Sequence, residues 1–295
     1  MNVRSVLFIP GDSEKKLAKA DDFAADAIVL DLEDSVAPAR KPVAREMVRE
    51  FLHARSGERK SQLWVRINPL DHPDVLQDLV RTIGGCPDCI MQPKTDGPQD
   101  VERLSHYLDA LEAREGIEPG RVKIHSISTE TAVAMFTLGE YAEARLPRLV
   151  SMNWGAEDLS SAIGAAGNKG ADGDWDFPYQ IVRTQFLFAA HAAGVQAMDT
   201  LFADYRDDEG LRRSCELARR QGFTGRIAIH PAQVDIINES FSPSEADVAH
   251  AHRLVAAFAA EPDAGTIGLD GKMYDIPHLN QAKHVLALHA AYSDD

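Results

Sequence analysis

The stretch Ala27-Ile28-Val29-Leu30-Asp31-Leu32 decides the fold, because a run this apolar on both faces is typical of a strand buried in a parallel sheet. Seven more short apolar or β-rich runs follow the same pattern, at residues 5–9, 62–67, 89–92, 122–128, 148–154, 194–199 and 226–229. Stretches with apolar residues at helical spacing separate these runs. Eight such units within 295 residues predict a closed (β/α)8 TIM barrel of the α/β class.

The segment after the last predicted strand exceeds what a barrel requires. Ser244 is suited to cap a helix that runs to about Ala260, and a second helix passes through Leu279 and Leu286. We therefore predict a catalytic barrel over residues 1–240 and a C-terminal helical extension, or lid, over residues 241–295. Residues 164–180, rich in glycine and aspartate, are expected to form a long loop over the barrel mouth.

The composition restricts the class of function. A formal net charge of -15 and a pI near 5.1 argue against nucleic acid or an anionic membrane as the main partner. The sequence has no run of ~18 apolar residues and no secretory pattern at its start, so we expect a cytoplasmic protein. The C-x-x-C pair of Cys86 and Cys89 lacks a second ligand pair, which favours incidental thiols over a redox or zinc half-site.

Polar and charged side chains end nearly every predicted strand, which is where TIM-barrel chemistry gathers. They include Asp31, Glu33, Arg66, Lys94, Glu130, Asp158, Asp199 and His230. Glu130 and Asp158 follow consecutive strands, so their carboxylates can converge. Two such oxygen ligands without a nearby histidine or cysteine fit Mg²⁺. Two solvated helix N-caps would explain the same pattern, and the residues alone leave both readings open.

The basic side chains near the predicted strand ends also have two interpretations, ligand binding or a purely structural role. Arg66 is placed to hold a carboxylate or stabilise an enolate, but an ion pair with Asp31 or Glu33 explains it equally well. For Lys94 a structural ion pair is slightly favoured. Near the N-terminus, Lys15, Lys16 and Lys19, with Arg4, form either a phosphate-binding patch or an ordinary solvated face.

Several blocks of the sequence, in order, resemble the citrate lyase β-subunit-like and malyl-CoA lyase family of aldolase/citrate lyase TIM barrels. The resemblance extends over nearly the whole chain. The blocks are Arg4-Ser5-Val6-Leu7-Phe8-Ile9-Pro10-Gly11, Asp31-Leu32-Glu33-Asp34-Ser35-Val36, Val65-Arg66-Ile67-Asn68, Pro93-Lys94, Thr129-Glu130-Thr131, Gly155-Ala156-Glu157-Asp158-Leu159, Gly222-Phe223-Thr224-Gly225-Arg226, Ile229-His230-Pro231-Ala232-Gln233 and Gly271-Lys272-Met273-Tyr274-Asp275-Ile276-Pro277.

The resemblance implies a Mg²⁺-dependent enzyme, with Mn²⁺ as a possible substitute, that reversibly cleaves a 3-hydroxyacyl-CoA into an acyl-CoA and a 2-oxo acid. It implies Glu130 and Asp158 as metal ligands and Arg66 as the group that binds the oxo acid and stabilises the enolate. Gly155, Ala156, Glu157 and Asp158 would contact the substrate, and Asp31, Glu33 and Lys94 would support the site. Arg4, Lys15, Lys16 and Lys19 are candidates for the phosphates of coenzyme A.

The resemblance also implies that Asp275, in the lid, is the acid/base and reaches a neighbouring subunit's site in a homo-oligomer, such as a trimer or hexamer. Ser128, Thr129 and Gln92 depart from the family pattern, and the two hydroxyls are expected to alter the oxo-acid pocket. The resemblance does not specify which 2-oxo acid is released among glyoxylate, pyruvate and oxaloacetate.

Besides a lyase whose substrate is a free hydroxy-oxo acid, three other functions compete with a CoA-dependent lyase. One is a CoA thioester hydrolase of the (3S)-malyl-CoA type. Another is a citrate lyase β-like subunit that acts on an acyl-carrier thioester within a complex, which the lid-like tail argues against because short carrier-dependent members would lack it. A non-catalytic barrel would not require so polar a mouth.

Overall fold

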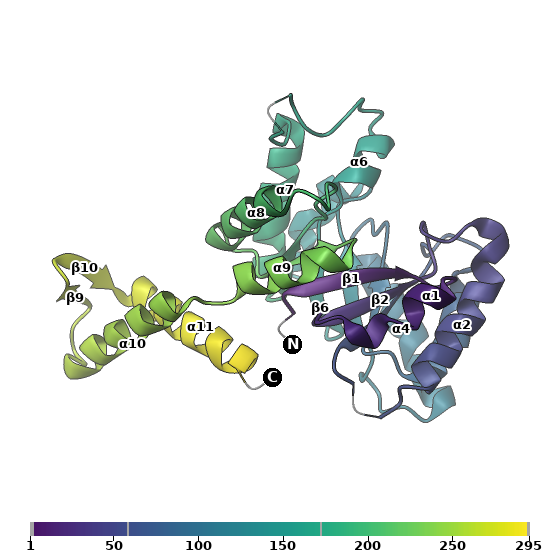
Figure 1. Cartoon of the computed structure of the whole chain (residues 1–295), viewed down its shortest axis with the longest axis horizontal. Helices are drawn as coiled ribbons and strands as arrows, with labels where there is room; N and C mark the ends of the chain where they lie inside the picture. The colour runs from purple at the N-terminus through teal and green to yellow at the C-terminus, as the bar shows by residue number, and fades with distance from the viewer. Residues whose placement is uncertain (1–2, 58, 172, 294–295) are drawn as a thin grey trace. The chain divides into compact units, whose positions relative to one another are not determined.

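Eight parallel strands close into a barrel in the computed structural model of the chain, which describes residues 3–57, 59–171 and 173–293 (Figure 1). The strands follow one another around the barrel in chain order, and the last pairs with the first. They are β1 (Ser5–Pro10), β2 (Ala27–Asp31), β3 (Gln62–Arg66), β4 (Cys89–Gln92), β5 (Lys123–Ile127), β6 (Leu149–Asn153), β7 (Gln196–Asp199) and β8 (Gly225–Ala228). The predicted TIM-barrel fold is therefore confirmed, and each predicted strand lies within a few residues of an observed one.

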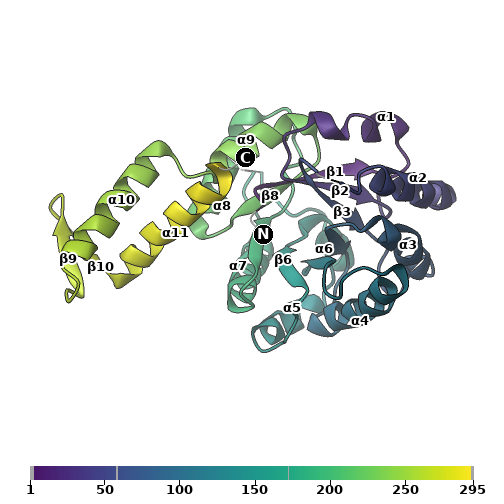
Figure 2. The same cartoon turned by 90° about the horizontal axis from the view of Figure 1, so that it is seen from below.

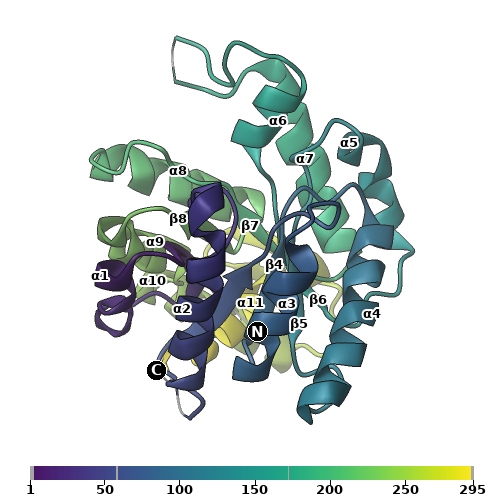
Figure 3. The same ribbon diagram turned by 90° about the vertical axis from the view of Figure 1, so that its right-hand side faces the viewer.

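Helices surround the strands on the outer side, as Figures 2 and 3 show for α2, α3, α4 and α7. The helices of the barrel region are α1 (Glu14–Leu17), α2 (Lys41–His53), α3 (Val75–Thr82), α4 (Pro98–Glu115), α5 (Ala134–Thr137), α6 (Ala156–Ala162), α7 (Phe177–Ala192), α8 (Asp208–Gln221) and α9 (Val234–Phe241). Short 3-10 turns lie at η1 (Ala20–Asp22), η2 (Pro38–Arg40), η3 (Ile83–Gly85), η4 (Leu138–Ala142) and η5 (Pro231–Gln233). The predicted loop at 164–180 ends earlier than expected, because α7 begins at Phe177.

The strand register determines where charged side chains gather in the barrel. Alternate residues of each strand face the barrel interior, where Val29, Trp64 and Met91 join one buried apolar cluster. Two residues further along β2 and β3, the same alternation brings Asp31 opposite Arg66. The apolar interior therefore gives way to charged side chains at the carboxyl ends of the strands.

The chain divides into two compact units, Val3–Asn238 and the residues from Glu239 onward, close to the predicted boundary. The second unit consists of α10 (Glu245–Ala260), a hairpin of β9 (Thr266–Leu269) and β10 (Lys272–Asp275), and α11 (Ile276–Ser293). Leu254, Phe258 and Ile267 belong to its own buried apolar cluster. Its role as a lid stays a prediction.

Sequence reasoning missed the hairpin in the second unit. Leu269 pairs with Lys272, so the turn contains only Asp270 and Gly271. Both have positive φ, 52° and 75°, as a tight hairpin turn requires. The Asp-Gly pair was the available signal. None of the helices over the described residues combines the length and apolarity that crossing a membrane requires.

Candidate active site

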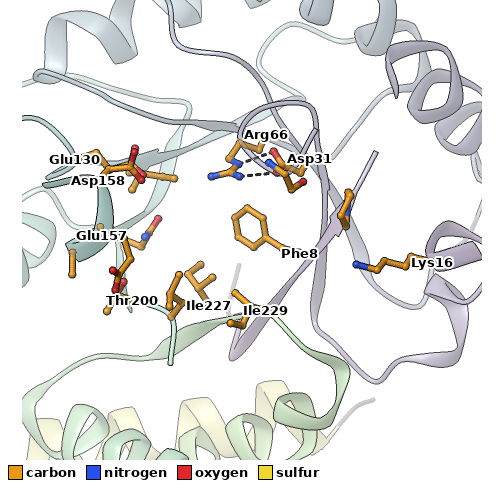
Figure 4. Close-up of a pocket in the computed structure, with 17 residues that line it drawn as sticks. Phe8, Lys16, Asp31, Arg66, Glu130, Glu157, Asp158, Thr200, Ile227 and Ile229 are labelled. Atoms are coloured by element: carbon orange, nitrogen blue, oxygen red, sulfur yellow. Dashed lines mark hydrogen bonds and ion pairs between the residues drawn. The ribbon is translucent and has the colours of Figure 1, made fainter. Parts of the chain in front are cut away.

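A cavity of about 270 Å³ opens at the carboxyl ends of the barrel strands (Figure 4). Its polar lining comes from the last residues of several strands and from the segments that follow them: Lys16, Asp31, Ser35, Arg66, Glu130, Asn153, Glu157, Asp158 and Thr200. Its apolar lining includes Phe8, Ile127, Leu201, Ile227 and Ile229. A concave pocket with a few convergent charged groups is the arrangement expected of an active site.

Arg66 lies at the end of β3 and is held rigidly. Its Nε and Nη2 donate to the two oxygens of Asp31 at 2.7 and 2.6 Å, and its Nη1 lies 2.9 Å from Glu33 Oε2 (Figure 4 draws the bonds to Asp31). The Phe8 ring lies 4.8 Å from the guanidinium carbon. The ion pair left open by the sequence is present, yet Arg66 also lines the cavity, so the two readings coexist.

The Asp31 carboxylate stays ionised beneath this arginine. Burial opposes its ionisation, but the charge and hydrogen bonds of Arg66 outweigh burial and hold the pKa of Asp31 below its ordinary value. Backbone N–H groups of Glu33 and Ser35 also donate to Asp31. Asp31 therefore fixes the Arg66 side chain and leaves the exposed edge of the guanidinium to a ligand.

Lys94 joins three acidic groups around the rim. Its Nζ lies 2.5 Å from Glu33 Oε1, 3.1 Å from Asp34 Oδ2 and 3.2 Å from Asp158 Oδ1. Its backbone has φ of 50°, which is uncommon outside glycine, and its backbone N–H donates to Glu130 Oε2 at 2.6 Å. The structural ion pair favoured by the sequence is therefore present.

Glu130 is a buried carboxyl that has little to stabilise its charge. It is 5% exposed, and across the described residues no side-chain cation pairs with it. Burial, and then the nearby charge of Asp158, raise the pKa of Glu130 to about 8. A Cβ on Gly155 would come within 2.6 Å of Glu130 Cγ, so a glycine is required where the carboxylate packs.

These observations test whether the two carboxylates fit a divalent cation. Asp158 lies in the first turn of α6, whose N-cap is Gly155, and α5 is preceded by Val133 as its N-cap, so neither acid is a helix cap as the alternative required. Within the described ranges, no cluster of three or more histidine, cysteine or acidic side chains could hold a metal. Two carboxylates are enough for Mg²⁺, which fills its other positions with water or substrate. The residues fit the ion.

Ser128 and Thr129 are not among the residues that line the cavity. Ser128 Oγ lies 2.9 Å from Ser126 Oγ, and Thr129 Oγ1 accepts the backbone N–H of Gly155 at 2.9 Å. Gln92 is likewise buried away from the cavity lining. The effect of these hydroxyls on the oxo-acid pocket stays a prediction, and Thr129 contacts the site through the Gly155 backbone.

Arg4 is misplaced for binding coenzyme A with the other candidates. It precedes β1, at the amino end of the barrel, and its guanidinium pairs with Asp26 at 2.7 and 2.9 Å. The cavity lies at the opposite, carboxyl ends of the strands. We therefore remove Arg4 from the candidate site.

Of the three predicted lysines, only Lys16 lines the cavity. Lys15 and Lys19 are exposed. Helix α1 is a single turn, so an appeal to its macrodipole carries little weight. The side chains themselves remain the argument for an anionic ligand.

Asp275 ends β10 in the second unit, so it belongs to a different compact unit from the cavity. Its Oδ1 lies 2.5 Å from His278 Nδ1, and this hydrogen bond lowers the pKa of Asp275. Gly155, Ala156 and Glu157 all line the cavity with Asp158, and their contact with the substrate stays a prediction.

Sequence reasoning also missed several lining residues: Phe8, Asn153, Thr200, Leu201, Ile227 and Ile229. The apolar members looked like ordinary core positions. Asn153, however, is a polar residue one position before the end of the predicted strand 148–154 and the last residue of β6, so applying the strand-end rule residue by residue would have found it.

Comparison with known proteins identifies the family of this chain. The model of the HpcH/HpaI aldolase/citrate lyase family matches residues 4–231, which contain the whole cavity. The chain belongs to this family. The predicted family resemblance is therefore confirmed.

Relatives within the family have different named activities. The chain is 34% identical to a (3S)-malyl-CoA thioesterase of Cereibacter sphaeroides, over 96% of this chain and 93% of the relative. It is 33% identical to the citrate lyase subunit beta of Haemophilus influenzae, over 96% of this chain and 95% of the relative. Coverage of 96% leaves too few residues unmatched to omit the 241–295 segment, so the expectation that citrate lyase β subunits lack the extension is wrong.

Solved structures give the same fold. The protein CitE of Mycobacterium tuberculosis, in complex with magnesium, acetoacetate and coenzyme A, superposes with a TM-score of 0.79 at 32% identity, covering 98% of both chains. A citrate lyase beta subunit of the same organism, complexed with oxaloacetate and magnesium, has a TM-score of 0.68 at 32% identity, over 82% of this chain and 98% of that one.

Proposed function

We propose that this protein is a Mg²⁺-dependent carbon–carbon lyase that reversibly cleaves a 3-hydroxyacyl-CoA of the malyl-CoA or citramalyl-CoA type into an acyl-CoA and a 2-oxo acid. The observation that carries the proposal is the cavity in which Arg66 faces the Glu130 and Asp158 carboxylates. The magnesium, oxo-acid and coenzyme A ligands of the solved relatives support it.

Glu130 and Asp158 would hold the metal, and the backbone around Gly155 to Glu157 would border the bound oxo acid. Magnesium, when bound, supplies Lewis-acid polarisation of the substrate oxygens. The two carboxylates would hold the ion in the cavity that Arg66 also lines. Arg66 would then supply a second positive charge to the bound substrate.

Arg66 would stabilise the negative charge that develops as the bond breaks. Cleavage would transfer the hydroxyl proton of the substrate to the ionised carboxylate of Asp275, break the bond between the hydroxyl-bearing carbon and the carbon next to the thioester, and leave an enolate of the acyl-CoA. Arg66 is fixed by Asp31 and Glu33 before the substrate arrives. A donor held in place in this way costs no reorganisation during the reaction, and one such donor contributes about 3 kcal/mol.

Asp275 would return a proton to the enolate carbon, and in the reverse direction it would abstract that proton. We assign it to the site of a neighbouring subunit in a homo-oligomer, such as a trimer or hexamer. Lys16 at the cavity rim, with Lys15 and Lys19 on the same segment, would bind phosphates of coenzyme A.

A second candidate function is hydrolysis of the thioester, which is favoured by the likeness to the malyl-CoA thioesterase. The third is action on an acyl-carrier thioester, favoured by the likeness to citrate lyase β subunits. The three reactions release different products: an oxo acid with acyl-CoA, free CoA, or nothing from a CoA thioester.

The test is product analysis with the purified chain, Mg²⁺, and malyl-CoA or citramalyl-CoA. We expect stoichiometric oxo acid, trapped as its phenylhydrazone, together with acetyl-CoA and no free thiol. Glu130→Gln is the matched inactive control, since it keeps the shape of the side chain and removes the charge. Free CoA without oxo acid would support the hydrolase, and complete inertness towards CoA thioesters would support the carrier-dependent subunit.

A further inference from the structure

A chain of hydrogen bonds runs through the barrel interior to the cavity and ends at Asn153. His125 on β5 lies opposite Ser151 on β6 in the strand register, and Asn153 is the next residue along β6 on the same face. His125 Nδ1 is 2.7 Å from Ser151 Oγ, and its Nε2 is 2.6 Å from Asn153 Oδ1. None of these groups has a role in the reaction as described above.

The donor and acceptor of each hydrogen bond among Ser151, His125 and Asn153 follow from one carbonyl group, that of Trp154. Asn153 Nδ2 donates to the backbone oxygen of Trp154 at 3.0 Å, and a carbonyl can only accept. The amide oxygen must therefore face His125, so His125 Nε2 carries the proton. The other ring nitrogen is then an acceptor, and the Ser151 hydroxyl donates to it.

The histidine that orients Asn153 is kept neutral. It is completely buried, against the Trp64 ring at a centroid distance of 5.1 Å, and burial lowers the pKa of His125 to about 4. A neutral imidazole has one donor and one acceptor, and both are used here. His125 therefore stays neutral near neutral pH and acts only as a fixed support.

One N–H of the Asn153 amide is left over. The side chain lines the cavity, and over the described part of the chain Nδ2 has the Trp154 carbonyl as its acceptor and no second protein partner. The asparagine is 4% exposed, so leaving that N–H without an acceptor is costly. The amide oxygen already accepts a hydrogen bond from His125, and the second N–H is the group that Asn153 offers to the cavity.

We propose that Asn153 is a specificity-determining residue that donates a hydrogen bond to a carboxylate or carbonyl oxygen of the oxo-acid portion of the substrate, and that His125 is the positioning residue that orients it. This inference rests on the proposed lyase function. It assigns to the substrate an acceptor oxygen at the β6 side of the cavity, on the wall that also carries Asp158. A site that requires an acceptor rejects analogues that lack it, because the buried donor is left unpaired.

The test measures binding of glyoxylate, pyruvate and oxaloacetate to the full-length protein in Mg²⁺ by titration calorimetry. Asn153→Leu removes the donor at similar volume, and we expect it to weaken the best-bound oxo acid about 10-fold. His125→Phe keeps a ring against Trp64 but loses both hydrogen bonds, and we expect a weakening of several-fold. His125→Gln can still donate to the Asn153 oxygen and should restore most of the affinity.

The double variant separates positioning from mere structure. If His125 acts through Asn153, His125→Phe adds no further loss of oxo-acid affinity to Asn153→Leu. Ser126→Ala, on the same strand but outside the hydrogen-bond chain to the cavity, is the control and should bind the oxo acid as wild type does.

Wild-type affinity in Asn153→Leu would overturn this inference while leaving the lyase proposal in place. Additive losses in the double variant would overturn the role of His125. Failure of the wild-type protein to bind any of the three oxo acids would sink the proposed function, and this inference with it. The Asn153→Leu variant by itself tests whether Asn153 donates a hydrogen bond to the oxo acid. That test therefore holds even if His125→Phe folds poorly.

Discussion

Glu130 illustrates how a single residue can be unfavourable for the fold and useful for the site. Its carboxyl is buried beside Asp158, and both burial and that neighbouring charge favour the protonated form. A divalent cation between the two acids would reverse this preference, since it stabilises the ionised carboxylates. Metal binding and proton release are therefore coupled at this position.

The first prediction concerns stability against pH. The pKa of Glu130 is raised to about 8 in the folded protein, from an ordinary value of 4.5. Between those values the unfolded chain has lost the proton and the folded chain keeps it, so the contribution of this group to stability falls as pH rises. We expect urea unfolding in EDTA to show this decline from pH 5 to 8, and Mg²⁺ to reduce it. Glu130→Gln should lack this component, and an identical pH dependence in that variant would refute the assignment.

The second prediction concerns Gly155. A methyl group there would meet Glu130 Cγ at 2.6 Å, so Gly155→Ala should displace the carboxylate and weaken Mg²⁺ binding about 10-fold. The matched control is Gly139→Ala, where an added Cβ meets nothing within 4 Å. Calorimetric titration with Mg²⁺ measures both variants. Unchanged affinity in Gly155→Ala would show that Glu130 is not a ligand.

At the scale of elements, the strands of the barrel could be predicted because buried parallel strands have a distinctive composition. The acids, Arg66 and Lys94 could be found because the strand-end rule needs no knowledge of contacts. The strand-end rule could also have found Asn153, but not its hydrogen bond to His125, because the two residues are 28 positions apart in sequence and meet only through the β5–β6 register. Arg4 was misassigned because it is close to the three lysines in sequence. Arg4 precedes β1 and the lysines follow it, so the strand places them at opposite ends of the barrel.

The hairpin of the second unit was missed for a different reason. Its strands are four residues each, and their alternation of exposed and buried positions is too brief to register as a pattern. Only the Asp270-Gly271 turn identifies it, through backbone conformations that glycine and aspartate tolerate.

The third prediction belongs to this element. Gly271 has φ of 75°, so Gly271→Ala should destabilise the β9–β10 hairpin by about 1 kcal/mol. The control is Gly268→Ala in β9, where no φ strain arises and an added Cβ meets nothing within 4 Å. Hydrogen exchange of the β9 and β10 amides measures the effect directly. Equal protection in the two variants would contradict the turn assignment.

At the scale of the whole molecule, the proposed reaction requires groups from both compact units. The cavity belongs entirely to Val3–Asn238, whereas Asp275 belongs to the unit that follows. Sequence reasoning could supply the two units but not their arrangement in an assembly, because that depends on surfaces between subunits and leaves no periodic signal.

The fourth prediction tests that arrangement. Asp275→Asn should abolish turnover while oxo-acid and Mg²⁺ binding persist, whereas Glu130→Gln should abolish metal binding. If Asp275 acts in a neighbouring subunit, mixing the two inactive variants under conditions of subunit exchange should restore part of the activity, since some mixed sites contain both intact groups. The control is each variant mixed with itself. A monomeric species with full activity would contradict the proposal.

The pairing of β1 with β8 has a consequence for how the protein is made. Phe8 and Ile227 lie on these two neighbouring strands and line the same cavity, yet more than two hundred residues separate them along the chain. During synthesis β8 must emerge from the ribosome before this part of the cavity can form. A nascent chain that ends before β8 therefore has no complete site for a ligand to bind. Substrate or metal added to stalled intermediates should therefore protect none of them until β8 has emerged.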